Sequence, residues 1–126
     1  MKNFLLVLVV IFALSNIANA DGITKRVKFQ KGQSAATFEG TVIRGDRDTY
    51  LLKAGKNQTM NITITSEEEN AVFQVKDTKT GKYLKGAGTG NDAVYFTGEL
   101  PSDGDYKVIV GGTRGNASYT ITISIE

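Results

Sequence analysis

The side chains that could do chemistry in this chain are hydroxyls, carboxylates and basic groups, because the sequence has no His and no Cys. A Ser or Thr nucleophile needs a base to take its proton, and the usual base is His. No motif places a Lys beside a particular Ser. The carboxylates cluster in turns, where Asp serves as a cap, so no pair is set up for glycoside hydrolysis. The composition therefore predicts a protein that binds rather than an enzyme.

A glycine-rich segment, Gly111 to Asn116, is the strongest candidate for a binding site, because it joins two strongly alternating runs. One interpretation is a hairpin loop whose glycines supply positive φ, with Arg114 simply solvated. The other is that Arg114, on a protruding loop, enters an acidic cleft and binds carboxylates through both arms of its guanidinium. A rigid β scaffold loses little entropy when such a loop binds, which suits an inhibitor.

The remaining charged residues have simpler explanations. The acidic side chains of the turns could offer oxygen ligands to calcium, but none belongs to the twelve-residue loop with a terminal Glu. Glu67 to Glu69 is most simply a solvated loop tip, and Arg44-Gly45-Asp46, a cell-adhesion tripeptide elsewhere, is attributed to chance. The sequence therefore predicts no metal site and no cofactor. The turn acids considered are Asp46, Asp48, Asp92, Asp103 and Asp105.

Short strands separated by Gly, Asp and Asn must position these residues. Period-two alternation is clearest at Met60 to Ile64, at Tyr106 to Val110 and at Tyr119 to Ile125. It assigns Tyr106 and Tyr119 to packing. Turn signals every 8 to 12 residues are typical of a sandwich or jelly roll, so we expect one antiparallel, jelly-roll-like β-sandwich of about eight strands. Weaker alternation occurs near Val27 and Phe29, Ala36 to Val42, Tyr50 and Leu52, Ala71 to Val75, and Val94 and Phe96.

The first twenty residues are predicted to be a secretory signal peptide. Lys2 precedes an apolar run from Phe4 to Leu14, and Ala18-Asn19-Ala20 supplies a small-x-small cleavage site. The apolar run is too short to span a bilayer. The expected mature domain, residues 21–126, is therefore an exported, periplasmic domain without a membrane-inserted segment. The 15 basic and 13 acidic residues of the chain nearly balance, which argues against nucleic acid as a partner.

Several motifs, in order and spacing, resemble the periplasmic inhibitors of g-type (goose-type) lysozyme. The opening Val27-Lys28-Phe29-Gln30-Lys31-Gly32 is followed by Gly40, by Gly45 and by Asp48-Thr49-Tyr50, and later come Leu100 to Tyr106 and Thr113-Arg114. The resemblance covers most of the chain after the leader. This sequence departs from it in two loops. The loop before Asp48 is one residue shorter and carries Asp46-Arg47 in place of an expected aromatic residue, and after Arg114 the chain returns to the strand at once, without a longer basic segment that holds a second Arg.

The resemblance implies a compact β-sandwich that blocks the substrate cleft of a g-type lysozyme with loops. It places Arg114 as the anchor, with Thr113 and Asn116 in the same loop. It places Asp46 and Arg47, beside Tyr50, in a second contact loop.

Part of the pattern is also similar to the pre-peptidase C-terminal domains, the all-β accessory modules of secreted proteases. Leu100-Pro101 followed by Gly104 and Tyr106 is common to both families. That resemblance implies a free-standing module that binds carbohydrate or protein through an exposed aromatic such as Tyr83 or Tyr95, with or without calcium. A structural envelope protein without a soluble ligand is a third alternative.

Overall fold

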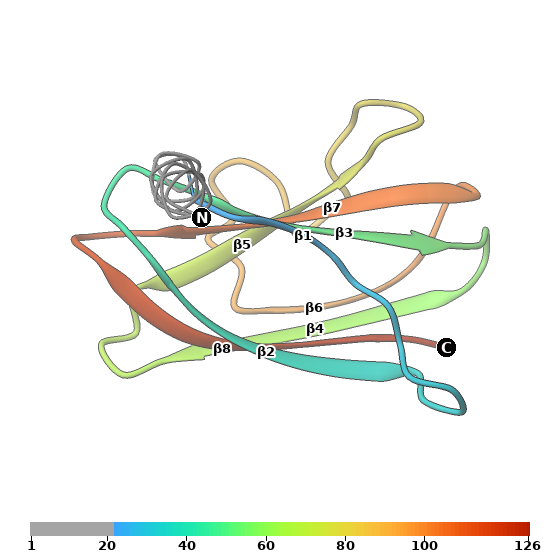
Figure 1. Ribbon diagram of the computed structural model, residues 1–126. Helices are drawn as coiled ribbons and strands as arrows, with labels where there is room; N and C mark the ends of the chain where they lie inside the picture. Colours follow the sequence, from blue (N-terminus) through green and yellow to red (C-terminus); the bar gives the residue numbers. More distant parts are fainter. Residues whose placement is uncertain (1–21) are drawn as a thin grey trace, which may run out of the picture.

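Residues 22–126, the part of the chain that the computed structural model describes, form eight β-strands and no helix (Figure 1). The expected signal peptide lies outside these residues. Within them no helix is long and apolar enough to cross a membrane. The strands are β1 (Thr24–Arg26), β2 (Ala35–Val42), β3 (Asp48–Ala54), β4 (Thr59–Ser66), β5 (Ala71–Asp77), β6 (Tyr95–Glu99), β7 (Gly104–Gly112) and β8 (Ala117–Ile125).

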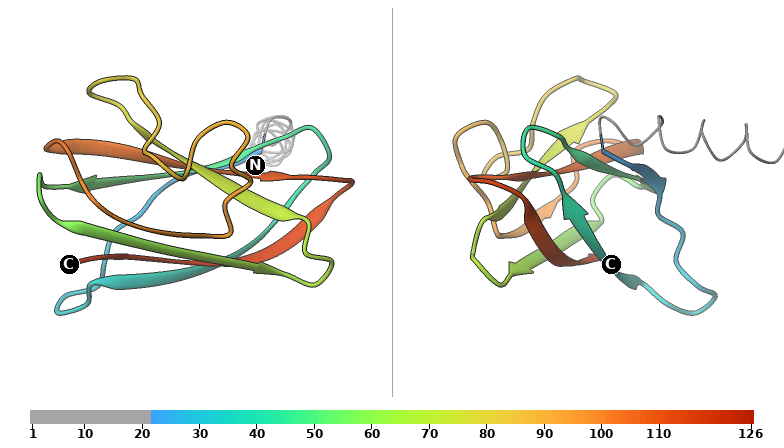
Figure 2. Two further views of the ribbon diagram at one scale, coloured as in Figure 1. Left: turned by 180° about the vertical axis from the view of Figure 1, so that it is seen from behind. Right: turned by 60° about the vertical axis from the view of Figure 1, so that its left-hand side comes forward.

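The strands form two four-stranded sheets that pack face to face (Figures 1 and 2). One sheet has the order β1-β3-β7-β5 and the other has the order β2-β8-β4-β6. The pairs are antiparallel except for β1 and β3, which run parallel. The predicted β-sandwich of eight strands is confirmed.

The core lies between the sheets and is filled by every second residue of the long strands. Along β8 the burial alternates from Ala117 to Ile125, and along β4 Met60, Ile62 and Ile64 are buried. Each fully buried aliphatic or aromatic side chain stabilises the fold by roughly 1.5–3 kcal/mol. The predicted packing of Tyr106 and Tyr119 is confirmed, because they are 0% and 4% exposed.

The first strand differs from the prediction, which placed it at Val27 and Phe29. The paired residues are Thr24 to Arg26, which lie beside Thr49 to Leu51. Val27 still donates its N–H to the Leu51 carbonyl at 2.7 Å and is buried, and Phe29 packs against the core. The apolar alternation of Val27 and Phe29 therefore reflects contact with the core at positions that follow the paired residues of β1.

A buried polar group links the two sheets. The Tyr119 hydroxyl donates to Asp48 Oδ2 at 2.6 Å and accepts from the Tyr50 hydroxyl at 2.7 Å, while the Ile23 N–H donates to Asp48 Oδ1 at 3.0 Å. Burial, followed by the hydrogen bonds to Asp48 and Tyr50, raises the pKa of Tyr119. Gly40 makes room for this ring, because a Cβ at that position would lie 2.6 Å from the Tyr119 hydroxyl oxygen.

Candidate functional site

Three loops lie together at one end of the sandwich, and strand register puts them there. Val42 at the end of β2 pairs with Ala117 at the start of β8, and Ala71 at the start of β5 pairs with Gly112 at the end of β7. The views in Figures 1 and 2 agree on this arrangement. We call this the three-loop end: the β2–β3 loop (residues 43–47), the β4–β5 loop (67–70) and the β7–β8 loop (113–116).

Asn70, which the sequence analysis did not single out, holds the β7–β8 loop. Its side-chain Nδ2 donates to the carbonyls of Arg114 and Asn116, each at 3.0 Å, and its own carbonyl accepts from the Thr113 N–H at 2.9 Å. Asn70 is 2% exposed, so these bonds are shielded from water. Its Oδ1 has no hydrogen-bond partner within residues 22–126. Asn70 directly follows three consecutive Glu residues, and its hydrogen-bond partners lie more than forty residues away in the sequence. No local sequence pattern therefore indicates that it holds the β7–β8 loop.

Arg114 is exposed at the tip of this loop. One arm of its guanidinium, Nη2, donates to the Glu68 carbonyl at 2.6 Å. A guanidinium has five donors, so the others stay available to a partner. The bond directs Arg114 toward the β4–β5 loop while leaving it in solvent, and Thr113 and Asn116 are exposed beside it.

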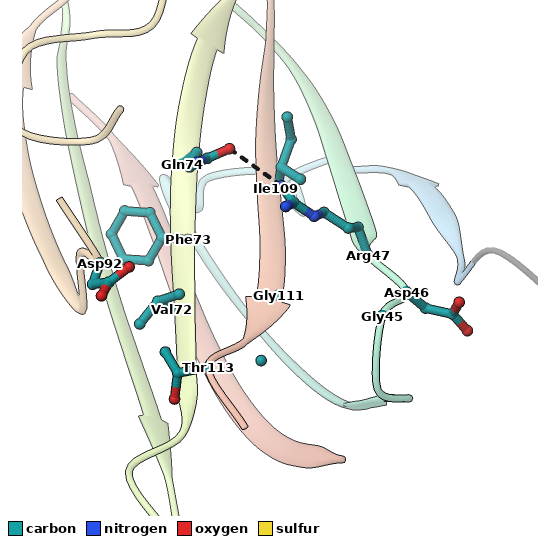
Figure 3. Close-up of a pocket in the computed structure, with 11 residues that line it drawn as sticks. Gly45, Asp46, Arg47, Val72, Phe73, Gln74, Asp92, Ile109, Gly111 and Thr113 are labelled. Atoms are coloured by element: carbon teal, nitrogen blue, oxygen red, sulfur yellow. Dashed lines mark hydrogen bonds between the residues drawn. The ribbon is translucent and has the colours of Figure 1, made fainter. Parts of the chain in front are cut away.

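The β2–β3 loop is attached to the β7–β8 loop. The Arg44 N–H donates to Asn116 Oδ1 at 2.8 Å, and the Asp46 N–H closes a turn onto the Ile43 carbonyl at 2.8 Å. Arg47 extends the other way, across the outer face of its sheet, where Nη1 lies 3.4 Å from Gln74 Oε1 (Figure 3). Asp46 points away from this face (Figure 3).

Tyr50 does not lie on this surface, which corrects the expectation that its side chain contacts a partner. It is 1% exposed, and its hydroxyl is hydrogen-bonded to Tyr119. Its ring stacks on Phe38, with centroids 5.2 Å apart. Burial raises the pKa of Tyr50. Although Tyr50 follows the contact turn closely in sequence, its side chain belongs to the core.

Two hollows adjoin the β2–β3 and β7–β8 loops. A groove of about 320 Å³ runs over the outer face of β5 and β7 between Arg47 and Asp92, with Gln74 and Ile109 in its floor (Figure 3). A second hollow of about 450 Å³ lies between the β2–β3 and β7–β8 loops. It is lined by Arg44, Gly45, Gly112, Thr113, Arg114 and Gly115.

The features of the alternative hypothesis are dispersed. Tyr95 on β6 is 60% exposed and Tyr83 is 39% exposed, with the Lys76 ammonium 5.4 Å from the Tyr83 ring centroid. Among residues 22–126, no three His, Cys, Asp or Glu side chains are grouped so that they could hold a metal ion. Asp103 accepts from the Lys56 N–H and Asp105 pairs with Arg26, so these two turn acids have structural partners.

The chain is similar to a curated inhibitor of g-type lysozyme from Escherichia coli K12. The two are 30% identical over 101 residues, which cover 79% of this chain and 68% of the relative. This chain belongs to the family of g-type lysozyme inhibitors. No protein-family model matches it.

Solved structures agree with the family. The periplasmic g-type lysozyme inhibitor of Aeromonas hydrophila is 28% identical, with a TM-score of 0.71 over 85% of this chain and 100% of that structure. The inhibitor from Salmonella Typhimurium is 27% identical, with a TM-score of 0.66 over 83% of this chain and 99% of its own. The pre-peptidase C-terminal domain of a Bacillus anthracis collagenase, at 19% identity and a TM-score of 0.56 over 82% of this chain and 94% of its own, shares the fold alone.

Proposed function

We propose that this family member is a periplasmic inhibitor of g-type lysozyme that blocks the muramidase cleft with the three-loop end. Its relatives carry that function in their names. The observation that carries the mechanism is the tether that Asn70 provides, which holds an exposed Arg114 at the tip of a fixed loop.

The inhibition proposed here needs no chemistry from the inhibitor. Glycoside hydrolases generally work through a pair of carboxylates in a cleft. A guanidinium that enters such a cleft can bind a carboxylate with two parallel hydrogen bonds, and this interaction strengthens as water is excluded. Arg114 is the anchor in this proposal, and Thr113 and Asn116 contribute the loop surface around it.

Preorganisation supports this mechanism. Three hydrogen bonds to Asn70 and one from Arg44 to Asn116 fix the loop before a partner arrives. The entropy lost on binding is then limited mainly to the side chains at the tip. Asp46 and Arg47 are rim contacts in this arrangement, while Tyr50 supports the loop from inside the core.

The proposal includes export. Residues 1–20 act as the signal peptide and residues 21–126 form the periplasmic domain, which matches the periplasmic location given for the solved relatives.

The test is to express the chain with its own leader, purify it from the periplasm and measure muramidase inhibition. Goose-type and chicken-type lysozymes are compared, and a mass spectrum reports the cleavage site. The expected result is saturable inhibition of the goose-type enzyme, weaker or no inhibition of the chicken-type enzyme, and a chain that begins at Asp21. Absence of binding to the goose-type enzyme would refute the proposed function.

A further inference from the structure

We infer that the hollow between the β2–β3 and β7–β8 loops is a carboxylate-binding site in which Arg44 acts together with Arg114. This inference rests on the proposed function and adds a second binding residue to it. It also gives a role to Arg44, which belongs to the tripeptide Arg44-Gly45-Asp46 that the sequence analysis attributes to chance.

The lining of the hollow carries positive charge only. Its charged residues are Arg44 from one loop and Arg114 from the other, and the rest of the lining is Thr113 and three glycines. No acidic side chain lines it. The hollow, of about 450 Å³, leaves room for an incoming side chain, and the two arginines in its lining favour an anionic one.

The structure fixes the two arginines relative to each other through their backbones. The Arg44 N–H bonds to the Asn116 side chain, and the carbonyls of Asn116 and Arg114 both accept from Asn70. Asn70 is buried, so the chain of contacts that joins the two loops is anchored in the core. The Arg44 guanidinium is exposed and forms neither a hydrogen bond nor an ion pair with residues 22–126. It is therefore available to a ligand.

Arg47, which the resemblance places in the second contact loop, lies elsewhere. Its guanidinium faces Gln74 in the groove on the outer sheet face (Figure 3). Arg47 does not line the hollow that contains Arg114. The spatial partner of Arg114 across the loops is thus Arg44 and not Arg47.

A planar carboxylate fits this pair best. Each guanidinium presents a fork of donors that matches the two oxygens of a carboxylate, and two forks can share one carboxylate or bind two. The Asp and Glu side chains in the cleft of the lysozyme supply this chemistry under the proposed function. Two desolvated ion pairs would also make the binding depend strongly on each arginine.

The first arm of the test does not use lysozyme. The probe is the dipeptide acetyl-Asp-Glu-amide, titrated at low salt into the ¹⁵N-labelled protein, and acetyl-Asn-Gln-amide is the uncharged control. The acidic probe is expected to shift the side-chain N–H signals of Arg44 and Arg114 together, and the neutral probe is expected to shift neither. The Arg47 side chain should be unaffected.

The second arm measures the affinity of the full periplasmic protein for goose-type lysozyme. Arg44→Gln, an exposed substitution that keeps the fold, is expected to raise Kd at least about tenfold, as loss of an interface arginine does. Lys56→Gln, the matched control, removes an exposed cation in the turn between β3 and β4, outside the three-loop end, and is expected to change Kd less than about threefold. Melting temperatures of both variants should equal that of the parent.

The outcomes separate the two hypotheses. If lysozyme binds and Arg44→Gln leaves Kd unchanged, or Lys56→Gln weakens binding as much, the two-arginine site is wrong and the proposed function stands. If lysozyme does not bind but the acidic dipeptide shifts both arginines, the proposed function is wrong and the site stands. If lysozyme does not bind and the acidic dipeptide shifts neither arginine, both hypotheses are wrong.

Discussion

Arg114 carries its charge on a loop tip, and the proposed function makes it the anchor of the interface. Truncation of a desolvated anchor arginine costs at least about 2 kcal/mol of binding free energy, or roughly 30-fold in Kd. We expect this loss for Arg114→Ala against goose-type lysozyme, measured by calorimetric titration. Lys53→Ala, which removes an exposed cation on β3, is the control and should bind like the parent. An unchanged Kd for Arg114→Ala would remove it from the interface.

The buried tyrosines predict how stability responds to alkaline pH. Burial and hydrogen bonding raise the pKa of Tyr119, and burial raises the pKa of Tyr50, above the ordinary value of about 10. The folded state therefore holds these protons more tightly than the unfolded state. Their contribution is complete below about pH 10 and is lost as the pH rises further, because the unfolded chain then ionises more readily.

We accordingly expect the urea midpoint of the protein to fall above about pH 10. Tyr119→Phe removes a hydroxyl that donates to Asp48, so it should destabilise the fold by about 1–3 kcal/mol at neutral pH. It should also show a shallower alkaline decline, since one raised pKa is gone. The decline will not vanish, because burial also raises the pKa of Tyr106. An equally steep decline in the variant would contradict the linkage to Tyr119.

Single residues also show where sequence reasoning stops. The alternation around Tyr119 predicts its burial, but its hydroxyl meets Tyr50 across 69 positions of sequence and Asp48 across 71. No local pattern contains that information. Tyr50 was therefore predicted as a surface contact because it follows the contact turn, although β3 directs its side chain into the core.

At the scale of elements, the β4–β5 loop matters because Asn70 joins it to the loop that presents Arg114. Asn70→Asp keeps the size of the side chain but replaces the donor group with an acceptor facing two carbonyls. A buried unpaired charge of this kind is expected to cost on the order of 3 kcal/mol of stability. Affinity for lysozyme should fall as well, because the loop loses its preorganisation.

Urea unfolding and amide exchange of Thr113 test this role. The Thr113 N–H, which donates to the Asn70 carbonyl, should exchange faster in Asn70→Asp than in the parent. Asn91→Asp is the matched control, because Asn91 Oδ1 accepts from the Gly88 N–H and a carboxylate can still accept. If the Thr113 N–H exchanges in Asn70→Asp at the rate of the parent, the β7–β8 loop does not depend on Asn70 for its conformation.

The elements themselves were predictable where the alternation was strong. Met60 to Ile64 and Tyr119 to Ile125 repeat with period two over several residues, so their strands and buried faces follow from sequence. The strand at Thr24 to Arg26 has no apolar pattern and pairs in parallel with β3 through backbone bonds, so it was misplaced. The grouping of three loops at one end depends on register between distant strands, which no single segment encodes.

At the scale of the whole molecule, the sandwich has two different ends. The three-loop end carries Arg44 and Arg114, whereas the opposite end carries the β3–β4 turn, because Ala54 pairs with Gly104 at the start of β7. Lys56 in that turn is exposed. The proposed inhibition uses only the first end, so a bulky group on the second should leave it intact.

The absence of cysteine from the sequence makes this last expectation directly testable. Thr113→Cys and Lys56→Cys each place one exposed thiol at a chosen end, to which a polyethylene glycol chain can be attached through a maleimide. Conjugation at position 113 should abolish inhibition of goose-type lysozyme, because the polymer keeps the loops out of the cleft. Conjugation at position 56 should leave inhibition close to that of the unconjugated variant. Equal loss of inhibition in both conjugates, or loss in the position 56 conjugate only, would contradict binding of lysozyme through the three-loop end alone. The assignment of Arg114 as the anchor would then be wrong as well.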